Sequence, residues 1–341
     1  MKVLVTGGCG FIGSHVVDEL VAAGLEVHVL DAADPAHRNE GAEYACADLR
    51  DPAAYEDTLE GIDAISHQAS KVGLEQSFAD AGEYVSHNDA GTAALLAALF
   101  ESSFGGRLVL ASSMVVYGEG SYGCSRHGTV QSPVRRPADL AAGRFEPFCP
   151  QCGAPLTARP VTEEAPIDPR NVYAATKVHQ EHLCTAFARA CGAELVALRY
   201  HNVYGPRMPS ASSYAGVASI FWSALSSGRP PQVTEDGRQS RDFVHVADVA
   251  RANLAALTAP IGTGGAFNIA SGRPRSVLEL ACALADASGP GAPSPEVTGA
   301  YRLGDVRHIF ASPERALRVL GWKAEVALEQ GVEALAAHRN F

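Results

Sequence analysis

The chain has 341 residues, of which 47% are hydrophobic and 19% charged, and its formal net charge is −11. This composition is typical of a globular protein and excludes a disordered one, and the acidic balance argues against nucleic acid as a partner, because phosphate contacts need clustered Lys and Arg. No apolar run approaches the roughly 20 residues of a membrane helix, and the first apolar run is too short for a signal peptide, so we expect a cytoplasmic protein with no membrane partner.

The first 112 residues alternate short apolar runs with helical patterns. They predict strands at 2–6, 26–30, 43–46, 64–68 and 107–112, and helices at 11–23, 52–59 and 86–104. Strands that alternate with helices in this way predict an α/β fold with a parallel, doubly wound sheet, the Rossmann arrangement.

The pattern breaks at residues 118–166, which we call the inserted segment and which has many Gly, Pro, Arg and Cys residues and little periodicity. A loop of this length needs something that ties it down. Beyond it we predict a strand at 194–199 and helices at 172–191, 217–227, 246–258, 277–287, 312–320 and 327–338. We expect a Rossmann domain at 1–204, which carries the inserted segment, and a smaller mixed α/β substrate lobe at 205–341, with residues near 241–270 returning to the first domain.

A glycine-rich turn joins the first strand to the first helix. The run 7–13 satisfies Gly-x-x-Gly-x-x-Gly and, from its second glycine, Gly-x-Gly-x-x-Gly. Such a turn lets the backbone approach a pyrophosphate at the N-terminus of a helix. We therefore expect the cofactor NAD to be bound here by Gly7, Gly10, Phe11, Ile12 and Gly13. The alternative is a tight turn that binds no ligand.

Two acidic positions are placed to contact the adenosine half of the cofactor. Asp31 ends the second strand, where a carboxylate accepts hydrogen bonds from ribose hydroxyls and repels a 2′-phosphate, which favours NAD over NADP. Asp48 and Leu49 follow the third strand and would border the adenine. The alternative for Asp31 is a solvated side chain at a strand end.

Tyr173 and Lys177 are four residues apart at the start of a predicted helix, so they share one face of it. A nearby ammonium and a positive nicotinamide ring both favour the phenolate form of a tyrosine. Ser113 lies at the carboxyl end of a predicted central strand, where side chains face the ligand crevice, and could complete a proton path with Tyr173. Taken alone, the Tyr-Lys pair would more often be a surface pair of a helix.

Together these motifs resemble the extended short-chain dehydrogenase/reductase family, in particular its NAD-dependent nucleotide-sugar epimerases and dehydratases. The resemblance covers nearly the whole chain. It implies further cofactor contacts from Gln68, Ala69, Ser70, Asn88 and Ser112, besides Tyr173 and Lys177. It also implies a nucleoside-diphosphate-sugar substrate bound by Lys71, Ser113, Met114, Asn202, Arg241, Arg302 and Asp305. Arg241 and Arg302 would bind the diphosphate, which suits guanidinium groups, and Asp305 a ribose hydroxyl.

The residues after Ser113 discriminate between reactions of this family. Its dehydratases resemble one another in an Asp-Glu pair at this point, and its decarboxylases keep a Glu, whereas this chain has Met114 and Val115, which cannot move a proton. We therefore predict a 4-epimerase: the sugar C4 is oxidised to a ketone with hydride transfer to NAD, and hydride returns to the other face. NAD would stay bound through each cycle.

A metal-like pattern lies in the inserted segment. Cys124 with His127 and Cys149 with Cys152 form two knuckles, each followed by a glycine, with the spacing of a structural zinc site. The alternative is four incidental residues. This insertion makes the chain most similar to the dTDP-L-rhamnose 4-epimerases of the family. The remaining cysteines are expected to be small buried side chains: Cys9, Cys46, Cys184, Cys191 and Cys282.

Several alternatives stay open at this point. Within the enzyme class they are a UDP-glucose or UDP-glucuronate 4-epimerase, and a 4-ketosugar reductase, although a reductase would prefer NADPH. Outside it, the fold could serve as an NAD-binding sensor or scaffold, which would have no need of a proton path. The resemblance also implies a homodimer, formed through the helices around 88–104 and 173–191.

Overall fold

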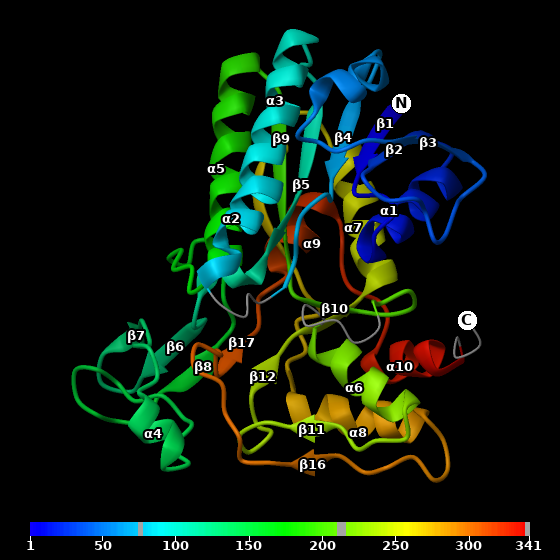
Figure 1. The fold of residues 1–341 in the computed structure, drawn as a ribbon. Helices are drawn as coiled ribbons and strands as arrows, with labels where there is room; N and C mark the ends of the chain where they lie inside the picture. Colours follow the sequence, from blue (N-terminus) through cyan, green and yellow to red (C-terminus); the bar gives the residue numbers. More distant parts are fainter. Residues whose placement is uncertain (74–77, 210–215, 338–341) are drawn as a thin grey trace.

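The computed structural model describes residues 1–73, 78–209 and 216–337 (Figure 1). Within them, a seven-stranded sheet has the strand order β14-β9-β5-β4-β1-β2-β3, and all its neighbouring strands are parallel. Its strands are β1 (Lys2–Thr6), β2 (Glu26–Asp31), β3 (Ala42–Cys46), β4 (Ala64–His67), β5 (Arg107–Ser113), β9 (Glu194–Tyr200) and β14 (Gly265–Ile269). The predicted α/β fold with a parallel, doubly wound sheet is confirmed.

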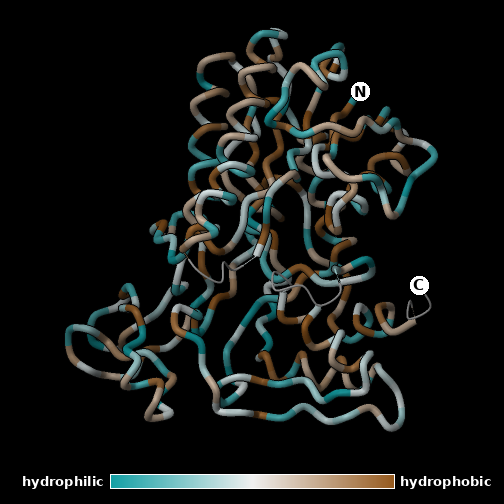
Figure 2. Tube along the Cα trace, viewed as in Figure 1, coloured by the Kyte–Doolittle hydropathy of each residue, from teal (hydrophilic) through white to brown (hydrophobic). Residues whose placement is uncertain are grey.

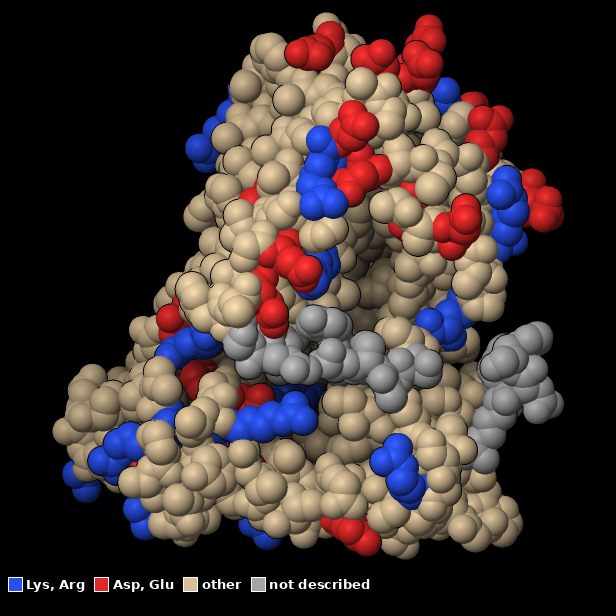
Figure 3. All heavy atoms as spheres, in the orientation of Figure 1, with Lys and Arg blue, Asp and Glu red and all other residues tan. Residues whose placement is uncertain are grey.

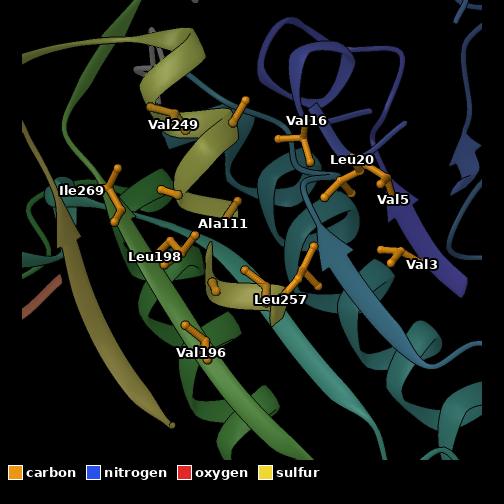
Figure 4. Packing of buried hydrophobic residues seen from close by; sticks show 14 of the residues in the cluster. Val3, Val5, Val16, Leu20, Ala111, Val196, Leu198, Val249, Leu257 and Ile269 are labelled. Carbon is orange, nitrogen blue, oxygen red and sulfur yellow. The ribbon is translucent and has the colours of Figure 1, made fainter. Parts of the chain in front are cut away.

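Helices cover both faces of this sheet, because its strands are apolar on both sides. Val3 and Val5 pack with α1 (Phe11–Ala22) and α7 (Val246–Thr258), whereas Leu4 between them packs with α3 (Gly91–Glu101) and α5 (Val172–Cys191). Figure 4 shows the first of these two layers, and Figure 2 shows the apolar strands at the centre of the fold. No helix in the described ranges has the length and apolar character needed to cross a bilayer.

Local signals set the ends of the long helix α5. The side chain of Asn171 accepts a hydrogen bond from the backbone N–H of Ala174 (2.7 Å), which caps the first turn. Gly192 follows the last turn with φ of +73°, a left-handed conformation that a glycine adopts without strain. These two caps place Tyr173 in the first turn of α5.

A smaller lobe lies below the carboxyl edge of the sheet (Figure 1). Its core is an apolar cluster formed largely by α6 (Val217–Ser226), α8 (Val277–Ala287) and α10 (Leu328–Ala337). The helix α9 (Glu314–Leu320) packs instead against β14. Short strands complete this part of the molecule: β10 (Asn202–Tyr204), β11 (Gln232–Val233), β12 (Ser240–Arg241), β13 (Phe243–His245), β15 (Arg275–Ser276), β16 (Glu296–Val297) and β17 (His308–Ile309).

The inserted segment has more regular structure than its sequence pattern indicated. It forms a three-stranded antiparallel sheet of β6 (Ser121–Cys124), β7 (Gly128–Val130) and β8 (Thr157–Arg159), together with the short helix α4 (Pro137–Ala141). Figure 1 shows it projecting beside β17. These strands are too short for a recognisable alternation of apolar residues, which is why the sequence did not reveal them.

Other predictions of single elements need correction. The predicted helix at 52–59 is two 3₁₀ turns at Pro52–Ala54 and Glu56–Leu59, and the predicted helix at 86–104 is a π-helical turn at Val85–Ala90 followed by α3. The seventh strand, β14, was not predicted. The last residue of the helix predicted at 327–338 lies outside the described residues. Cys46 and Cys282 are exposed, not buried.

Leu198 tests the contribution of this core. Its side chain is fully buried in the centre of the sheet, so Leu198→Ala should lower the free energy of unfolding by about 3 kcal/mol through lost burial and a cavity. The measurement is urea denaturation followed by circular dichroism. Ile261→Ala is the control, because that side chain is 96% exposed and its loss should change stability little. Equal effects of the two substitutions would contradict the packing described.

Candidate functional site

A cavity of about 1000 Å³ lies between the carboxyl edge of the sheet and the smaller lobe. Its wall runs from the glycine turn after β1, past the ends of β4 and β5 and the start of α5, to the segment before β17. Figure 3 shows this face hollowed above the lobe, with acidic side chains mostly over the upper half and Lys and Arg more frequent below. All but one of the predicted cofactor and substrate residues line this cavity.

The glycine turn fits a dinucleotide because it has no room for side chains. A Cβ on Gly13 would lie 2.1 Å from the carbonyl oxygen of Gly7. A Cβ on Gly7, whose φ is +70°, would lie 2.5 Å from the backbone nitrogen of Ala69 at the end of β4. The turn is therefore packed backbone to backbone, and its open side lines the cavity together with Gly10, Phe11 and Ile12.

Two backbone N–H groups hold the carboxylate of Asp31 at the cavity wall. Cys9 donates to one carboxylate oxygen (2.9 Å) and Ala33 to the other (3.0 Å). Asp48 and Leu49 line the same end, and Arg50 donates to the Asp48 carboxylate (2.6 Å) and keeps its pKa low, at about 2. Both aspartates thus present fixed carboxylates to the cavity, and their contact with the ribose and adenine of a dinucleotide stays a prediction.

Tyr173 and Ser113 are in contact with each other and both line the cavity. Ser113 ends β5, and its hydroxyl accepts a hydrogen bond from the backbone N–H of Val115 (3.3 Å). Burial raises the pKa of the Tyr173 hydroxyl above its ordinary value, and a hydrogen bond with the Ser113 side chain acts in the opposite direction. The ring of Tyr84 packs beside Tyr173, with 6.2 Å between the ring centres.

Lys177 lies one helical turn beyond Tyr173 and is buried. Its ammonium donates to the carbonyl oxygen of Ala111 (2.9 Å) and lies 5.9 Å from the centre of the Tyr173 ring. Burial lowers the pKa of Lys177 to about 8. The ammonium therefore supplies a positive charge beside the tyrosine at neutral pH, and this charge is lost as the pH rises through about 8.

Two predicted cofactor residues are engaged with the protein itself. Asn88 is fully buried and does not line the cavity; its side chain accepts from the backbone N–H of Lys71 (2.6 Å) and from the hydroxyl of Ser70 (3.0 Å). Its side chain therefore fixes the loop after β4, and its predicted contact with the cofactor is not tested by these bonds. Ser112 borders the cavity, but its hydroxyl donates to the Glu181 carboxylate on α5.

The residues predicted to bind the substrate all line the cavity, and we call the part that they line its substrate end. They are Lys71, Ser113, Met114, Asn202, Arg241, Arg302 and Asp305. Arg241 donates from its two terminal nitrogens to the carbonyl oxygens of Arg307 (3.0 Å) and Val306 (2.7 Å), which fixes its side chain. Burial raises the pKa of Asp305, and the neighbouring Arg241 and Arg302 act against that rise.

Some cavity residues were not singled out from the sequence. His201 follows β9, is buried, and has no hydrogen-bond partner for either ring nitrogen within the described part of the chain. Burial lowers its pKa to about 3, so it is neutral at ordinary pH. Gln239 and Arg170 also line the cavity. The position of Arg170, three residues before Tyr173, was the only sequence signal for it.

Cys124, His127, Cys149 and Cys152 come together in the inserted segment. Their ligand atoms all lie within 4.8 Å of one another. The two sulfurs of Cys124 and Cys152 are 3.7 Å apart, and the Nδ1 atom of His127 is 3.6 Å from the sulfur of Cys124 and 3.5 Å from that of Cys149. A tetrahedron with zinc–sulfur bonds of about 2.3 Å has edges of about 3.8 Å, so these spacings suit a zinc ion.

Gly13 tests the cofactor end of the cavity. In Gly13→Ala the new methyl group would collide with backbone and displace the turn, so the affinity for NAD should fall at least about tenfold. Calorimetric titration with NAD measures this. Gly105→Ala is the control, since a Cβ there meets nothing within 4 Å. An unchanged NAD affinity in Gly13→Ala would show that the turn does not bind the dinucleotide.

The sequence matches the model of the NAD dependent epimerase/dehydratase family over residues 3–139 and 150–270, and the unmatched stretch between them lies in the inserted segment. The dTDP-L-rhamnose 4-epimerase of Burkholderia thailandensis is 35% identical over 98% of this chain and 93% of that protein. The UDP-glucose 4-epimerase of Mycolicibacterium smegmatis is 32% identical over 97% and 96%.

A solved structure of a 4-epimerase has the same fold as this chain. The crystal structure of the UDP-glucose 4-epimerase of Thermus thermophilus, a complex with NAD, superimposes with a TM-score of 0.79 and 31% identity, covering 99% of each chain. The arrangement of the sheet and the smaller lobe is thus that of a known architecture. The chain is a member of the NAD dependent epimerase/dehydratase family.

Proposed function

We infer that the protein is a nucleoside-diphosphate-sugar 4-epimerase, an isomerase that uses NAD, and we propose dTDP-L-rhamnose as its substrate. The prediction of a 4-epimerase is confirmed, since relatives that span the chain carry that activity in their names. The mechanism rests on the hydrogen bond between Ser113, at the end of β5, and Tyr173, in the first turn of α5. Lys177 lies one turn further along the same helix and is buried beside Tyr173.

We propose that Ser113, Tyr173 and Lys177 each have a different role in transferring the proton of the sugar hydroxyl. Bound NAD would supply the hydride acceptor and donor for the sugar C4. The Tyr173 oxygen would take the proton of the 4-hydroxyl and later return it, and Ser113 would orient that hydroxyl by a hydrogen bond. Burial disfavours the phenolate of Tyr173, and the positive charge of Lys177, 5.9 Å from the centre of the ring, would favour it.

The wall next to Ser113 supports epimerisation over elimination. Met114 and Val115 line the cavity, and neither side chain can take up or release a proton. A dehydratase or decarboxylase needs an acid or base there. The chemistry that remains is oxidation at C4 followed by reduction from the other face after the sugar has turned.

A neutral sugar suits the cations at the substrate end. Lys71 forms an ion pair with Glu83, and Arg170 pairs with Asp168 at 2.5 Å. The carboxylate of a uronic acid would have to compete with these acidic groups. This favours dTDP-L-rhamnose or UDP-glucose over UDP-glucuronate, and the sequence identity with the Burkholderia enzyme favours the first.

A panel of nucleotide sugars tests this assignment. Purified protein should interconvert dTDP-L-rhamnose and its 4-epimer without added NAD, as measured by chromatography and NMR. Tyr173→Phe should reduce turnover by about 10²–10⁴-fold, because the proton acceptor is lost, while the amount of bound NAD stays the same. Release of water, net consumption of NADPH, or no conversion at all would contradict the 4-epimerase. Preferred conversion of UDP-glucose would contradict only the proposed sugar.

We also propose that Cys124, His127, Cys149 and Cys152 bind a structural zinc ion. The set of three sulfurs and one imidazole and the spacing of these atoms support this. A small apolar cluster around Tyr122, Val130 and Leu156 packs against the cysteines. Such a small core gives little stability by itself, and a metal would supply the missing cross-link.

Metal analysis tests the zinc site directly. The purified protein should contain about one zinc per chain, and Cys152→Ser should lose most of it, because one of four ligands is gone. Elemental analysis after gel filtration gives the stoichiometry. Cys46→Ser is the control, since that exposed cysteine lies far along the chain from the cluster and should not affect metal content. Less than about a tenth of an equivalent in untreated wild-type protein would contradict the proposal.

We further propose a homodimer formed through α3 and α5, supported by the exposure of Phe100 on α3. The division into an NAD-binding domain at 1–204 and a substrate lobe at 205–341 is likewise a proposal. It is supported by α7 and β14, which lie near 241–270 and pack with α1 and β9 of the first domain. The cytoplasmic location stays a prediction.

A further inference from the structure

The inserted segment forms hydrogen bonds with β17 and with the residues next to it, and the residues that precede β17 line the substrate end of the cavity. The Tyr122 hydroxyl accepts a hydrogen bond from the backbone N–H of His308 (3.2 Å), and the Glu119 carboxylate accepts from that of Arg307 (3.3 Å). Further along, the backbone N–H of Val161 donates to the carbonyl oxygen of Phe310 (2.8 Å). The inserted segment therefore holds the backbone of residues 307–310 at several successive points.

A buried ion cluster strengthens this contact. Arg307 has no exposed surface and binds three carboxylates, donating to Glu146 (3.0 Å), Glu235 (2.9 Å) and Asp236 (2.7 Å). Arg135 also donates to Glu235 (2.7 Å). Arg135 and Glu146 belong to the inserted segment, whereas Glu235 and Asp236 precede β12. The cluster thus joins the inserted segment to the lobe by charge-assisted hydrogen bonds.

The positions of Arg241 and Asp305, the residues proposed to bind the nucleoside diphosphate, depend on this ion cluster and on the backbone of residues 305–307. Arg241 is held by the carbonyl oxygens of Val306 and Arg307, and the carbonyl oxygen of Asp305 accepts from Arg135. Both Arg241 and Asp305 line the cavity. A shift of residues 305–307 would therefore move the guanidinium and the carboxylate that face the nucleotide.

The Cys/His cluster lies close in the chain to the residues of the inserted segment that contact 307 and 308. Cys124 ends β6, the strand that carries Tyr122, and Cys149 lies three residues after Glu146. The metal site and the ion cluster are thus linked by a few residues of backbone on each side. Fixing the four ligands fixes the segments that present Tyr122 and Glu146.

We propose that the inserted segment is a positioning module for the nucleoside diphosphate: closure of the Cys/His cluster, transmitted through Tyr122, Arg135, Glu146 and Arg307, sets the place of Arg241 and Asp305. This inference rests on the proposed function. The positioning residues do not touch the substrate; they act through the backbone of 305–308. Loss of the cluster or of the ion pairs should weaken binding of the diphosphate and leave NAD binding and the proton transfer at Tyr173 unchanged.

The first test uses Glu146→Gln, which removes one charge from the ion cluster at a half-exposed position where the fold should tolerate it. Calorimetric titration of NAD-loaded protein with dTDP and UDP measures binding without turnover. The affinity for the diphosphate should fall about tenfold, and KM for the nucleotide sugar should rise by a similar factor with kcat little changed. Arg136→Ala is the control, because this exposed side chain lies in the same segment and pairs only with Asp139 among the described residues.

The second test removes a metal ligand by Cys152→Ser, and its affinity for dTDP and UDP should fall at least as far as that of Glu146→Gln. NAD content and the circular dichroism spectrum should remain those of the wild type in both variants. Wild-type diphosphate affinity in both variants would overturn the inference, as would an equal loss in Arg136→Ala or a fall in kcat at constant KM. A wild-type protein that binds neither nucleotide and converts no sugar contradicts the proposed function itself, and the two failures are therefore distinguishable.

Discussion

The hydrogen bond from the buried ammonium of Lys177 to the carbonyl oxygen of Ala111 ties helix α5 to the end of strand β5. Together with the bond from Ser112 to Glu181, this contact fixes the helix that carries Tyr173 against the strand that ends in Ser113. An unpaired ammonium would be costly at such a depth, so the bond also explains how a lysine can be buried there. The contact between Tyr173 and Ser113 at the cavity wall depends on that arrangement of helix and strand.

Buried polar side chains also connect α5 to the loop after β4 and to α3. Asn88 binds the loop after β4 and also donates to the Thr176 hydroxyl of α5 (2.9 Å), and Gln180 donates to the Thr92 hydroxyl of α3 (2.7 Å). These side chains are buried and hydrogen-bonded across three elements, although the side-chain oxygen of Gln180 has no partner among the described residues. Such a buried network restrains the wall behind α5. The first turns of α5, which carry Tyr173 and Lys177, are therefore held in place before any ligand binds, and electrostatic catalysis requires such preorganisation.

The parts of the molecule that the sequence predicted are those with local signals. The glycine turn, the Tyr173–Lys177 spacing and the apolar strands β1, β4 and β5 each carry their pattern within a few residues. Asn88 is predicted to contact the cofactor, but motif position does not tell which way a side chain points. Strand β14 and the strands of the inserted segment are defined by pairing with distant residues, and the ion cluster of Arg307 joins three separate stretches, so no local pattern could reveal them.

The position of β14 at the edge of the sheet affects how the chain folds during its synthesis. Strand β9 pairs with β5 on one side, but its other partner is β14 at Gly265–Ile269, which follows α6 and α7 in the chain. During synthesis the outer edge of β9 stays unpaired until those residues have left the ribosome. An open, apolar edge is a template for wrong association. Truncated chains that end before residue 265 should accordingly be prone to aggregate, although they contain every residue of the glycine turn and the catalytic pair.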